Sequence, residues 1–318
     1  VRMKNMKARC TKSILFGMLS IGFLLFLQFP AFAEHKEISS KLSPQRIVVF
    51  PLFAEEILYE LVEPERIVYV GHRYDEAGID YWPTMSISRN AAGANWQNSG
   101  DEELLALHPD LLIFSGFQED EYEEIFPCLA AAEIPTLFLD EPSSIDEIAD
   151  SIMLLGNTVH EPERASSMVD KLRSSMDCVS KLVAELPENE IKTVALYGEP
   201  SHFFNIATTS CRIRGIYCPD EKALTDINPD IIVLLPSCSD AGFLLAIGKD
   251  YVNEIIDALI SDTSLSSLAA ITSNSIYAVN FYGSQYVSDS VMMLLKLAYP
   301  ELLNNDALCP IKSYPIVR

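Results

Sequence analysis

Positive charge is scarce in this chain. Its 318 residues include 23 Lys and Arg against 45 Asp and Glu, which gives a formal net charge of −22 at pH 7. Proteins that bind nucleic acid gather Lys and Arg on one face to neutralise phosphates. The sequence therefore predicts no nucleic-acid partner. Such acidity also disfavours a strongly anionic ligand unless local arginines collect it.

Catalytic motifs are absent from the sequence as well. It contains no GxSxG, no HExxH, no P-loop and no GxGxxG after a strand. No pattern therefore places a nucleophile beside a base, or a phosphate against a glycine-rich loop. We predict a binding protein and not an enzyme, with no intrinsic cofactor and no metal site of its own.

The seven cysteines show no CxxC or Cys/His spacing of the kind that binds zinc. Cys10 lies in the N-terminal segment, and the other six permit disulfides in about fifteen different pairings. Cys211 and Cys218 are close in sequence, and they are the pair that we expect first.

The first 33 residues have the layout of a signal peptide. Basic residues precede the apolar run SILFGMLSIGFLLFL, and Ala31 and Ala33 are spaced like a cleavage site before Glu34. The run is short for a membrane-spanning helix, which needs about 20 residues; a permanent anchor is the alternative. Because the segment holds five of the 23 basic residues and no acidic ones, its removal leaves 18 against 45, a charge of −27. We predict an exported, soluble monomer in the periplasm or another extracytoplasmic space.

Beyond residue 45, short apolar runs alternate with helical patterns. The candidate strands are near-continuous runs of β-branched and other apolar residues: 46–50, 66–70, 110–114, 136–139, 193–197, 231–235 and 276–279. The stretches of helical period between them are 54–62, 123–133, 144–156, 251–260 and 288–298. Such strands suit a parallel sheet that is covered on both faces, and the alternation predicts an α/β fold.

The middle of the chain differs from both sides. Residues 161–186 contain no strand pattern, and Met168, Leu172 and Met176 fall at helical spacing. We expect one helix of about 24 residues, about 36 Å long at 1.5 Å per residue.

One short pattern occurs twice, as DEELLALHPDLLIF (101–114) and DEKALTDINPDIIVLL (220–235). At an offset of 120 residues, Leu104 corresponds to Leu224, and Pro109-Asp110 corresponds to Pro229-Asp230. Each copy predicts a helix that runs through a Pro-Asp turn into a buried strand. Coincidence is the alternative, because such turns are common. The matching order of elements on both sides of the central helix favours a duplication.

Several stretches resemble a known family: RIVVFPLFAEEILYELV, DEELLALHPDLLIFSG and IPTLFLDEPSSIDEIADSIMLLG. With the export segment and the long helix, they are similar to the periplasmic binding proteins that serve ABC importers for vitamin B12, iron–siderophores and haem. The resemblance implies two Rossmann-like lobes with central parallel sheets, joined by one helix (the class III architecture). It also implies a ligand in the cleft between the lobes and little hinge motion. The implied organisation is a signal peptide (1–33), an N-terminal lobe (34–160), a linker helix (161–188) and a C-terminal lobe (189–318) that is shortened near its start.

In open parallel sheets, ligands bind beyond the carboxyl ends of the strands, and aromatic residues recur at these positions here. An aromatic lining suits a large metal chelate, such as a corrinoid, a ferric siderophore or haem. Core packing is the alternative role for each aromatic. The predicted ligand-binding residues are Phe53, His72, Arg73, Tyr74, Trp82, Trp96, Ser115, Phe117, Phe203, Phe204, Phe281 and Tyr282.

Three alternatives to a corrinoid or siderophore carrier stay open, and one of them is a binding lobe that acts as a sensor for a membrane receptor. A haem-binding member of the same family would use His72, Tyr74 or His202 as an axial ligand. An exported metalloenzyme of the chelatase type would use His72 with Asp75 or Glu76 as metal ligands.

The resemblance also implies a partner, an ABC importer composed of a permease and its ATPase. In vitamin-B12-type members, a surface glutamate on each lobe docks onto arginines of the permease. Glu102 matches the first-lobe position. The same offset in the second copy falls on Lys222, so we assign the second position to Glu221.

Overall fold

The computed structural model describes residues 43–71, 101–115, 126–198, 201–235, 237–240, 243–246, 249–279, 281 and 283–303. The chain divides into two compact units, residues 1–37 and 38–318, and all described residues belong to the second unit. The predicted signal peptide therefore lies outside the described residues. Within the described ranges, no helix is both long and apolar enough to span a membrane.

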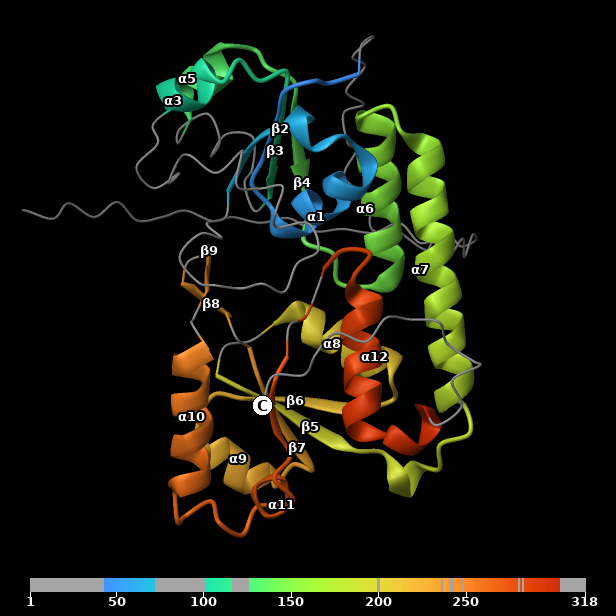
Figure 1. Cartoon of the computed structure of the whole chain (residues 1–318), viewed down its shortest axis with the longest axis vertical. Helices are drawn as coiled ribbons and strands as arrows, with labels where there is room; N and C mark the ends of the chain where they lie inside the picture. The colour runs from blue at the N-terminus through green and yellow to red at the C-terminus, as the bar shows by residue number, and fades with distance from the viewer. Residues whose placement is uncertain are drawn as a thin grey trace, which may run out of the picture. The chain divides into compact units, whose positions relative to one another are not determined.

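The first sheet has four parallel strands in the order β2-β1-β3-β4. Figure 1 labels β2, β3 and β4 of this sheet. They are β1 (Ile47–Val49), β2 (Ile67–Val70), β3 (Leu111–Ser115) and β4 (Thr136–Leu139). Ile47 and Val49 pack into a core with α1 (Leu52–Leu61) and α6 (Ile145–Thr158). Val48 packs on the other face with α3 (Asp101–Ala106) and α5 (Pro127–Ala131). We call this sheet with its four helices the first lobe.

The second sheet is also parallel, in the order β10-β7-β5-β6. Its strands are β5 (Thr193–Tyr197), β6 (Arg214–Cys218), β7 (Ile231–Leu234) and β10 (Ile276–Ala278). Val194 packs on one face with α8 (His202–Ser210) and α12 (Val287–Ala298). Ala195 packs on the other with α9 (Glu221–Ile227), α10 (Lys249–Ser261) and α11 (Ala269–Thr272). This sheet with its five helices is the second lobe.

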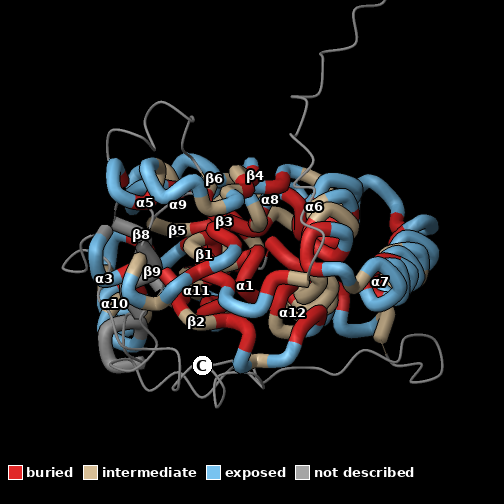
Figure 2. Tube along the Cα trace, turned by 90° about the horizontal axis from the view of Figure 1, so that it is seen from above, coloured by how far each residue is buried: buried red, intermediate tan, exposed pale blue. Residues whose placement is uncertain are grey.

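Five short elements lie outside the two parallel sheets and their helices: the 3-10 helices η1 (Pro64–Arg66), η2 (Glu188–Glu190) and η3 (Pro300–Leu303), and the antiparallel pair β8 (Ser237–Asp240) and β9 (Phe243–Ala246). The predicted α/β class with two parallel sheets, each covered on both faces, is confirmed. Figure 2 shows that β1, β3 and α1 are largely buried, as their near-continuous apolar sequences predict.

The two sheets share one topology. In each, the first strand in chain order (β1 or β5) lies between the second and the third, and the last strand pairs with the third. The repeated sequence forms the same unit in both lobes, α3 leading into β3 and α9 leading into β7. His108 and Asn228, which precede the two Pro-Asp turns, both have left-handed backbone conformations with φ of 49° and 50°. The predicted internal symmetry is therefore present in the fold.

The aspartate of each Pro-Asp turn makes equivalent hydrogen bonds. The Asp110 carboxylate accepts from the main-chain N–H groups of Gln45 (2.7 Å) and Arg46 (2.8 Å), just before β1. The Asp230 carboxylate accepts from the N–H of Thr193 (2.8 Å), the first residue of β5. Each aspartate also donates its own N–H, to the Arg46 or Thr193 carbonyl at 2.9 Å. In both lobes the turn therefore fixes the start of the central strand.

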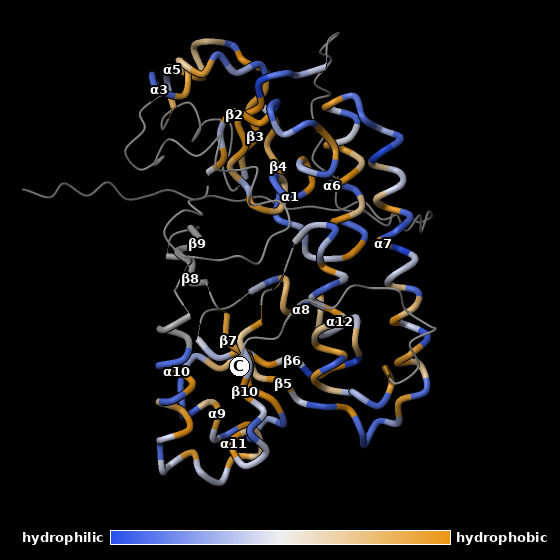
Figure 3. The backbone as a smooth tube through the Cα atoms, in the orientation of Figure 1, coloured by the Kyte–Doolittle hydropathy of each residue, from blue (hydrophilic) through white to orange (hydrophobic). Residues whose placement is uncertain are grey.

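Helix α7 (Pro162–Val183) follows the first lobe and is slightly shorter than the predicted helix over 161–186. Its 22 residues extend for about 33 Å, and it runs past α6 and α12 (Figure 1). Met168 and Leu172 belong to the core of the first lobe, Val179 and Val183 belong to that of the second, and Met176 packs against both. Much of the helix surface between these residues is hydrophilic (Figure 3). The helix is thus shared by the two lobes.

Strand β6 was not predicted. Its sequence, RGIYC, has no continuous apolar run, and Arg214 and Tyr217 are exposed because the strand lies at the edge of the sheet. Edge strands need less apolar sequence than central ones because fewer of their side chains face a core. The segment that we expected to be shortened contains both α8 and β6. The second sheet therefore has four strands, like the first.

The predicted disulfide between Cys211 and Cys218 is wrong, because both are free, buried thiols. Cys211 follows α8, and its thiol donates to the Val291 carbonyl at 3.1 Å. Cys218 lies at the far end of β6, and the rise along this strand is about 13 Å. A disulfide needs Cα atoms within about 7 Å of each other. Cys178, on α7, is disulfide-bonded.

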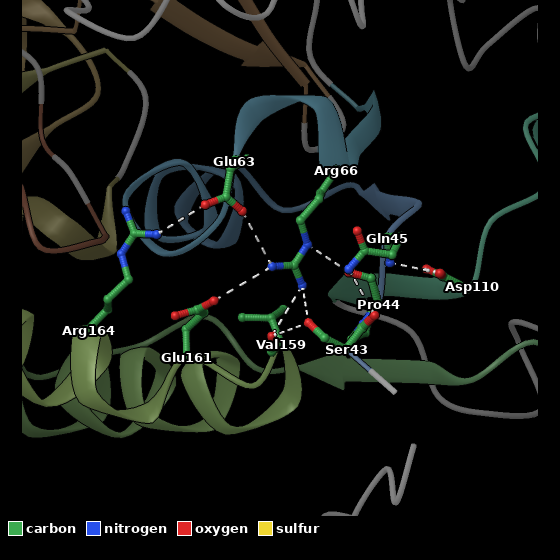
Figure 4. A network of polar contacts seen from close by, with 9 residues as sticks. All are labelled: Ser43, Pro44, Gln45, Glu63, Arg66, Asp110, Val159, Glu161 and Arg164. Carbon is green, nitrogen blue, oxygen red and sulfur yellow. Dashed lines mark hydrogen bonds and ion pairs between the residues drawn. The ribbon is translucent and has the colours of Figure 1, made fainter. Parts of the chain in front are cut away.

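Arg66 anchors the segment before β1 to the turn between α6 and α7 (Figure 4). The residue is 7% exposed. Its Nε donates to the Pro44 carbonyl (2.7 Å), and one terminal nitrogen donates to Ser43 Oγ (2.7 Å) and to the Val159 carbonyl (3.2 Å). The other terminal nitrogen lies 3.9 Å from the Glu161 carboxylate. A single guanidinium group thus satisfies carbonyl groups from two distant parts of the chain.

We predict that Arg66→Ala lowers the free energy of unfolding by about 3 kcal/mol, because buried carbonyl groups lose their donors. Urea denaturation measures the change. Arg164→Ala is the matched control, since Arg164 lies 3.9 Å from Glu63 with both side chains largely exposed. Such an exposed pair contributes less than about 1 kcal/mol. Equal losses in the two variants would show that the buried network is not what stabilises this region.

Candidate functional site where the two lobes meet

Residues that follow the carboxyl ends of β1 and β10 contact each other across the lobes. The Ser284 hydroxyl donates to the carboxyl group of Glu56, on α1. Gln285 Nε2 donates to the main-chain carbonyl of Glu56 at 3.0 Å. The Tyr286 hydroxyl donates to the Glu60 carboxylate at 2.9 Å. The segments that follow two of these strand ends, beyond which ligands of parallel sheets bind, therefore meet at this junction.

Apolar side chains surround this polar contact. Phe203, on α8, packs against the cores of both lobes. A Cβ atom on Gly283 would lie 2.3 Å from the Phe203 ring, so the glycine allows this ring to lie against the main chain. Ile206 on α8 and Val287 on α12 are members of the first-lobe core although their helices belong to the second lobe. The two cores are therefore in contact at the junction.

The carboxyl group of Glu56 is the most perturbed acid of this region. Glu56 is 5% exposed and Ser284 is fully buried. Burial raises the pKa of Glu56 to about 8, the Ser284 hydrogen bond opposes the rise, and the neighbouring Glu55 adds to it. Among the described residues, no cation contributes to the shift. The raised pKa favours the neutral form of Glu56 at pH 7.

Three of the predicted ligand residues lie together next to this junction: Phe203, Phe204 and Phe281. The rings of Phe204 and Phe281 are 5.3 Å apart at an interplanar angle of 75°. These two residues are 1% and 9% exposed, and Phe53 is 4% exposed in the core of the first lobe. Their burial matches the core-packing role that we gave as the alternative for aromatics, and their ligand role stays a prediction. Ser115 is the last residue of β3 and is half-buried at the carboxyl end of the sheet.

The other predicted ligand residues lie outside the described residues, and their roles stay predictions. They are His72, Arg73, Tyr74, Trp82, Trp96, Phe117 and Tyr282. His202, weighed above as a haem ligand, is the exposed first residue of α8. In the described part of the chain, no three His, Cys, Asp or Glu side chains are placed to hold a metal ion.

The two predicted docking glutamates occupy the first turns of the repeated helices. Glu102 is exposed on α3, and Glu221 is exposed at the start of α9. The Tyr197 hydroxyl donates to the Glu221 carboxylate at 2.7 Å. Lys222, which occupies the position equivalent to Glu102, pairs with Asp226 at 2.8 Å. The structure thus offers an exposed carboxylate on each lobe, and their docking role stays a prediction.

Sequence reasoning missed Glu56 and Ser284. One signal was present: apolar residues occupy most positions of the helix that contains Glu55 and Glu56. Adjacent helix residues point about 100° apart, so at least one of these two glutamates must face the apolar surroundings. The partner of Glu56 could not be found in this way, because Ser284 is 228 residues away.

Comparisons with known proteins agree with this architecture. A family model described as "Periplasmic binding protein" matches residues 56–282, from α1 to just beyond β10. A vitamin B12-binding protein from Pectobacterium atrosepticum is 27% identical over 161 residues, which cover 51% of this chain and 52% of that protein. The chain thus spans about half the length of this relative.

Two solved structures share the fold. The molybdate periplasmic binding protein of a Haemophilus influenzae ABC transporter has a TM-score of 0.64 and 14% identity, covering 83% of this chain and 89% of that one. A periplasmic heme-binding protein from Roseiflexus sp. RS-1 has a TM-score of 0.59 and 16% identity, covering 81% and 99%. The match to the family model covers more than half of the chain and includes strands of both sheets. The chain therefore belongs to the periplasmic binding protein family.

Proposed function

We propose that this chain is an extracytoplasmic solute-binding protein that delivers a metal chelate, a corrinoid or a ferric siderophore, to an ABC importer. The observation that carries the proposal is the family match over residues 56–282, which includes strands of both sheets. The vitamin B12-binding relative supports a corrinoid as the first ligand to test. The molybdate-binding neighbour, which serves an ABC transporter, supports the importer as partner.

Three features support an extracytoplasmic location. Residues 1–33 have the charge and apolar pattern of a signal peptide. Cys178 is disulfide-bonded, and disulfides persist mainly in oxidising compartments. The family is named for its periplasmic members. We propose that the ligand lies beyond the carboxyl ends of the two sheets, near Ser115 and Phe281 and the aromatic segment that follows β2.

The ligand class can be tested on the purified protein. We expect cyanocobalamin or a ferric hydroxamate such as ferrichrome to quench tryptophan fluorescence at one equivalent, because both tryptophans, Trp82 and Trp96, are predicted ligand residues. A saturating ligand at about 100 times its Kd adds about 2.7 kcal/mol to the unfolding free energy, which raises Tm by roughly 5 °C.

Hemin and molybdate serve as the comparison ligands in the same assay. Binding of hemin alone would favour the haem-binding alternative, and binding of molybdate alone would show that the site takes an oxyanion. If no metal chelate changes fluorescence or Tm, the chelate proposal is wrong, although the family assignment is unaffected.

The docking glutamates can be tested separately from the ligand. We expect Glu102→Lys and Glu221→Lys, alone and combined, to reduce uptake into proteoliposomes that hold the permease and ATPase, by roughly tenfold for the pair. The reason is that a lysine would face the arginines of the permease. Ligand affinity should not change. Glu103→Lys is the matched control, since Glu103 is also exposed on α3. Uptake that is equally reduced in the control, or unchanged in the double variant, would contradict the assignment.

A further inference from the structure

We propose that Glu56 is a positioning residue: its neutral carboxyl group holds the segment between β10 and α12 against α1, and ionisation of this group at alkaline pH releases the segment. The proposal concerns the junction of the lobes and does not depend on which ligand is bound. Its failure would therefore leave the proposed function untouched.

The first argument is the position of Ser284. Its hydroxyl donates to Glu56 and accepts from the N–H of Tyr286 at 3.3 Å. Its carbonyl accepts from the N–H of Val287, the first residue of α12, at 3.0 Å. Ser284 thus joins α1 of the first lobe to the start of α12 of the second. A change in the ionisation of Glu56 therefore directly affects the position of the residues between β10 and α12.

The second argument is the absence of a compensating cation among the described residues that face Glu56. On its own helix, the nearby titratable groups are Glu55, Tyr59 and Glu60. On the facing segment, they are Tyr286 and Asp289. All of these groups are acidic.

The helices packed around α1 supply no positive charge to this core either. Helices α6 and α8 contain no Lys or Arg, and His202 of α8 is exposed. The Lys and Arg residues of α7 are all exposed. Among the described residues, Ser284 is the one hydrogen-bond donor to the Glu56 carboxyl group. A buried carboxylate with so few partners is costly. Ionisation of Glu56 therefore favours opening of the junction, which lets water reach the charge.

The sign of the pH effect follows from the direction of the shift. The pKa of Glu56 is about 8 in the folded protein against 4.5 for an ordinary glutamate. Its contribution to stability is thus fully present below about pH 4.5 and is lost as pH rises through 8. Asp289, whose pKa burial raises to about 6, acts in the same direction at lower pH. Because Glu56→Gln retains Asp289, the difference between the profiles of the wild type and this variant isolates Glu56.

The test compares thermal unfolding of the full chain between pH 5 and 9. We expect the Tm of the wild type to fall relative to that of Glu56→Gln by roughly 5 °C between pH 6 and 8.5. The amide of the variant still accepts from Ser284 but cannot ionise. Glu60→Gln is the matched control: Glu60 also accepts a hydrogen bond from the facing segment, yet it is exposed. This control should keep the pH profile of the wild type.

Hydrogen exchange separates positioning from a general effect on stability. After correction for the intrinsic pH dependence, we expect amides of residues 283–290 in the wild type to exchange at least about tenfold faster at pH 8.5 than at pH 6. Amides of β7 should exchange at the same corrected rate at both pH values. Ser284→Ala should exchange fast in this segment at both pH values, and Glu56→Gln should exchange slowly at both.

Two results would overturn the proposal. The first is an identical Tm profile for the wild type and Glu56→Gln. The second is exchange in residues 283–290 that does not respond to pH in the wild type, a measurement that stands even if Glu56→Gln fails to fold.

Discussion

A carboxylate that holds the beginning of a strand is the constraint on which each lobe depends. Asp110 and Asp230 fix the entry to β1 and β5, which are the inner strands around which the two sheets are ordered. Because the side chains of a strand alternate between two faces, its register decides which of them meet which helix layer. A fixed strand entry therefore determines the composition of both cores in a lobe. The same hydrogen bonds of the aspartate occur in both lobes, which explains why the Pro-Asp turn is the part of the repeat that is easiest to recognise.

Much of the fold could be predicted from the sequence, for a physical reason. Strands buried on both faces must be apolar throughout, so runs such as those of β3 and β7 are conspicuous. Edge strand β6 and helix α8 were missed because their sequences, RGIYC and HFFNIATTS, show neither a continuous apolar run nor a long helical period. The predicted disulfide between Cys211 and Cys218 was wrong because an extended strand between two residues separates them widely in space even when they are close in sequence.

The candidate site was less predictable than the fold. The rule that ligands bind beyond strand ends indicates a region, and Ser115 does lie there. It cannot tell which side chains after a strand turn inward, and Phe53 and Phe204 are buried because the helices that carry them pack tightly onto the sheets. The contact between Glu56 and Ser284 could not be predicted, since it joins residues that are far apart in the chain and share no local pattern.

The position of α7 has a consequence for how the chain folds. One half of this helix completes the apolar core of the first lobe and the other half completes that of the second. Neither lobe can therefore bury its own apolar surface without a segment that also belongs to its neighbour. The sequence repeat gives two similar halves, yet we expect them to fold as a single cooperative unit, because the shared helix belongs to both cores.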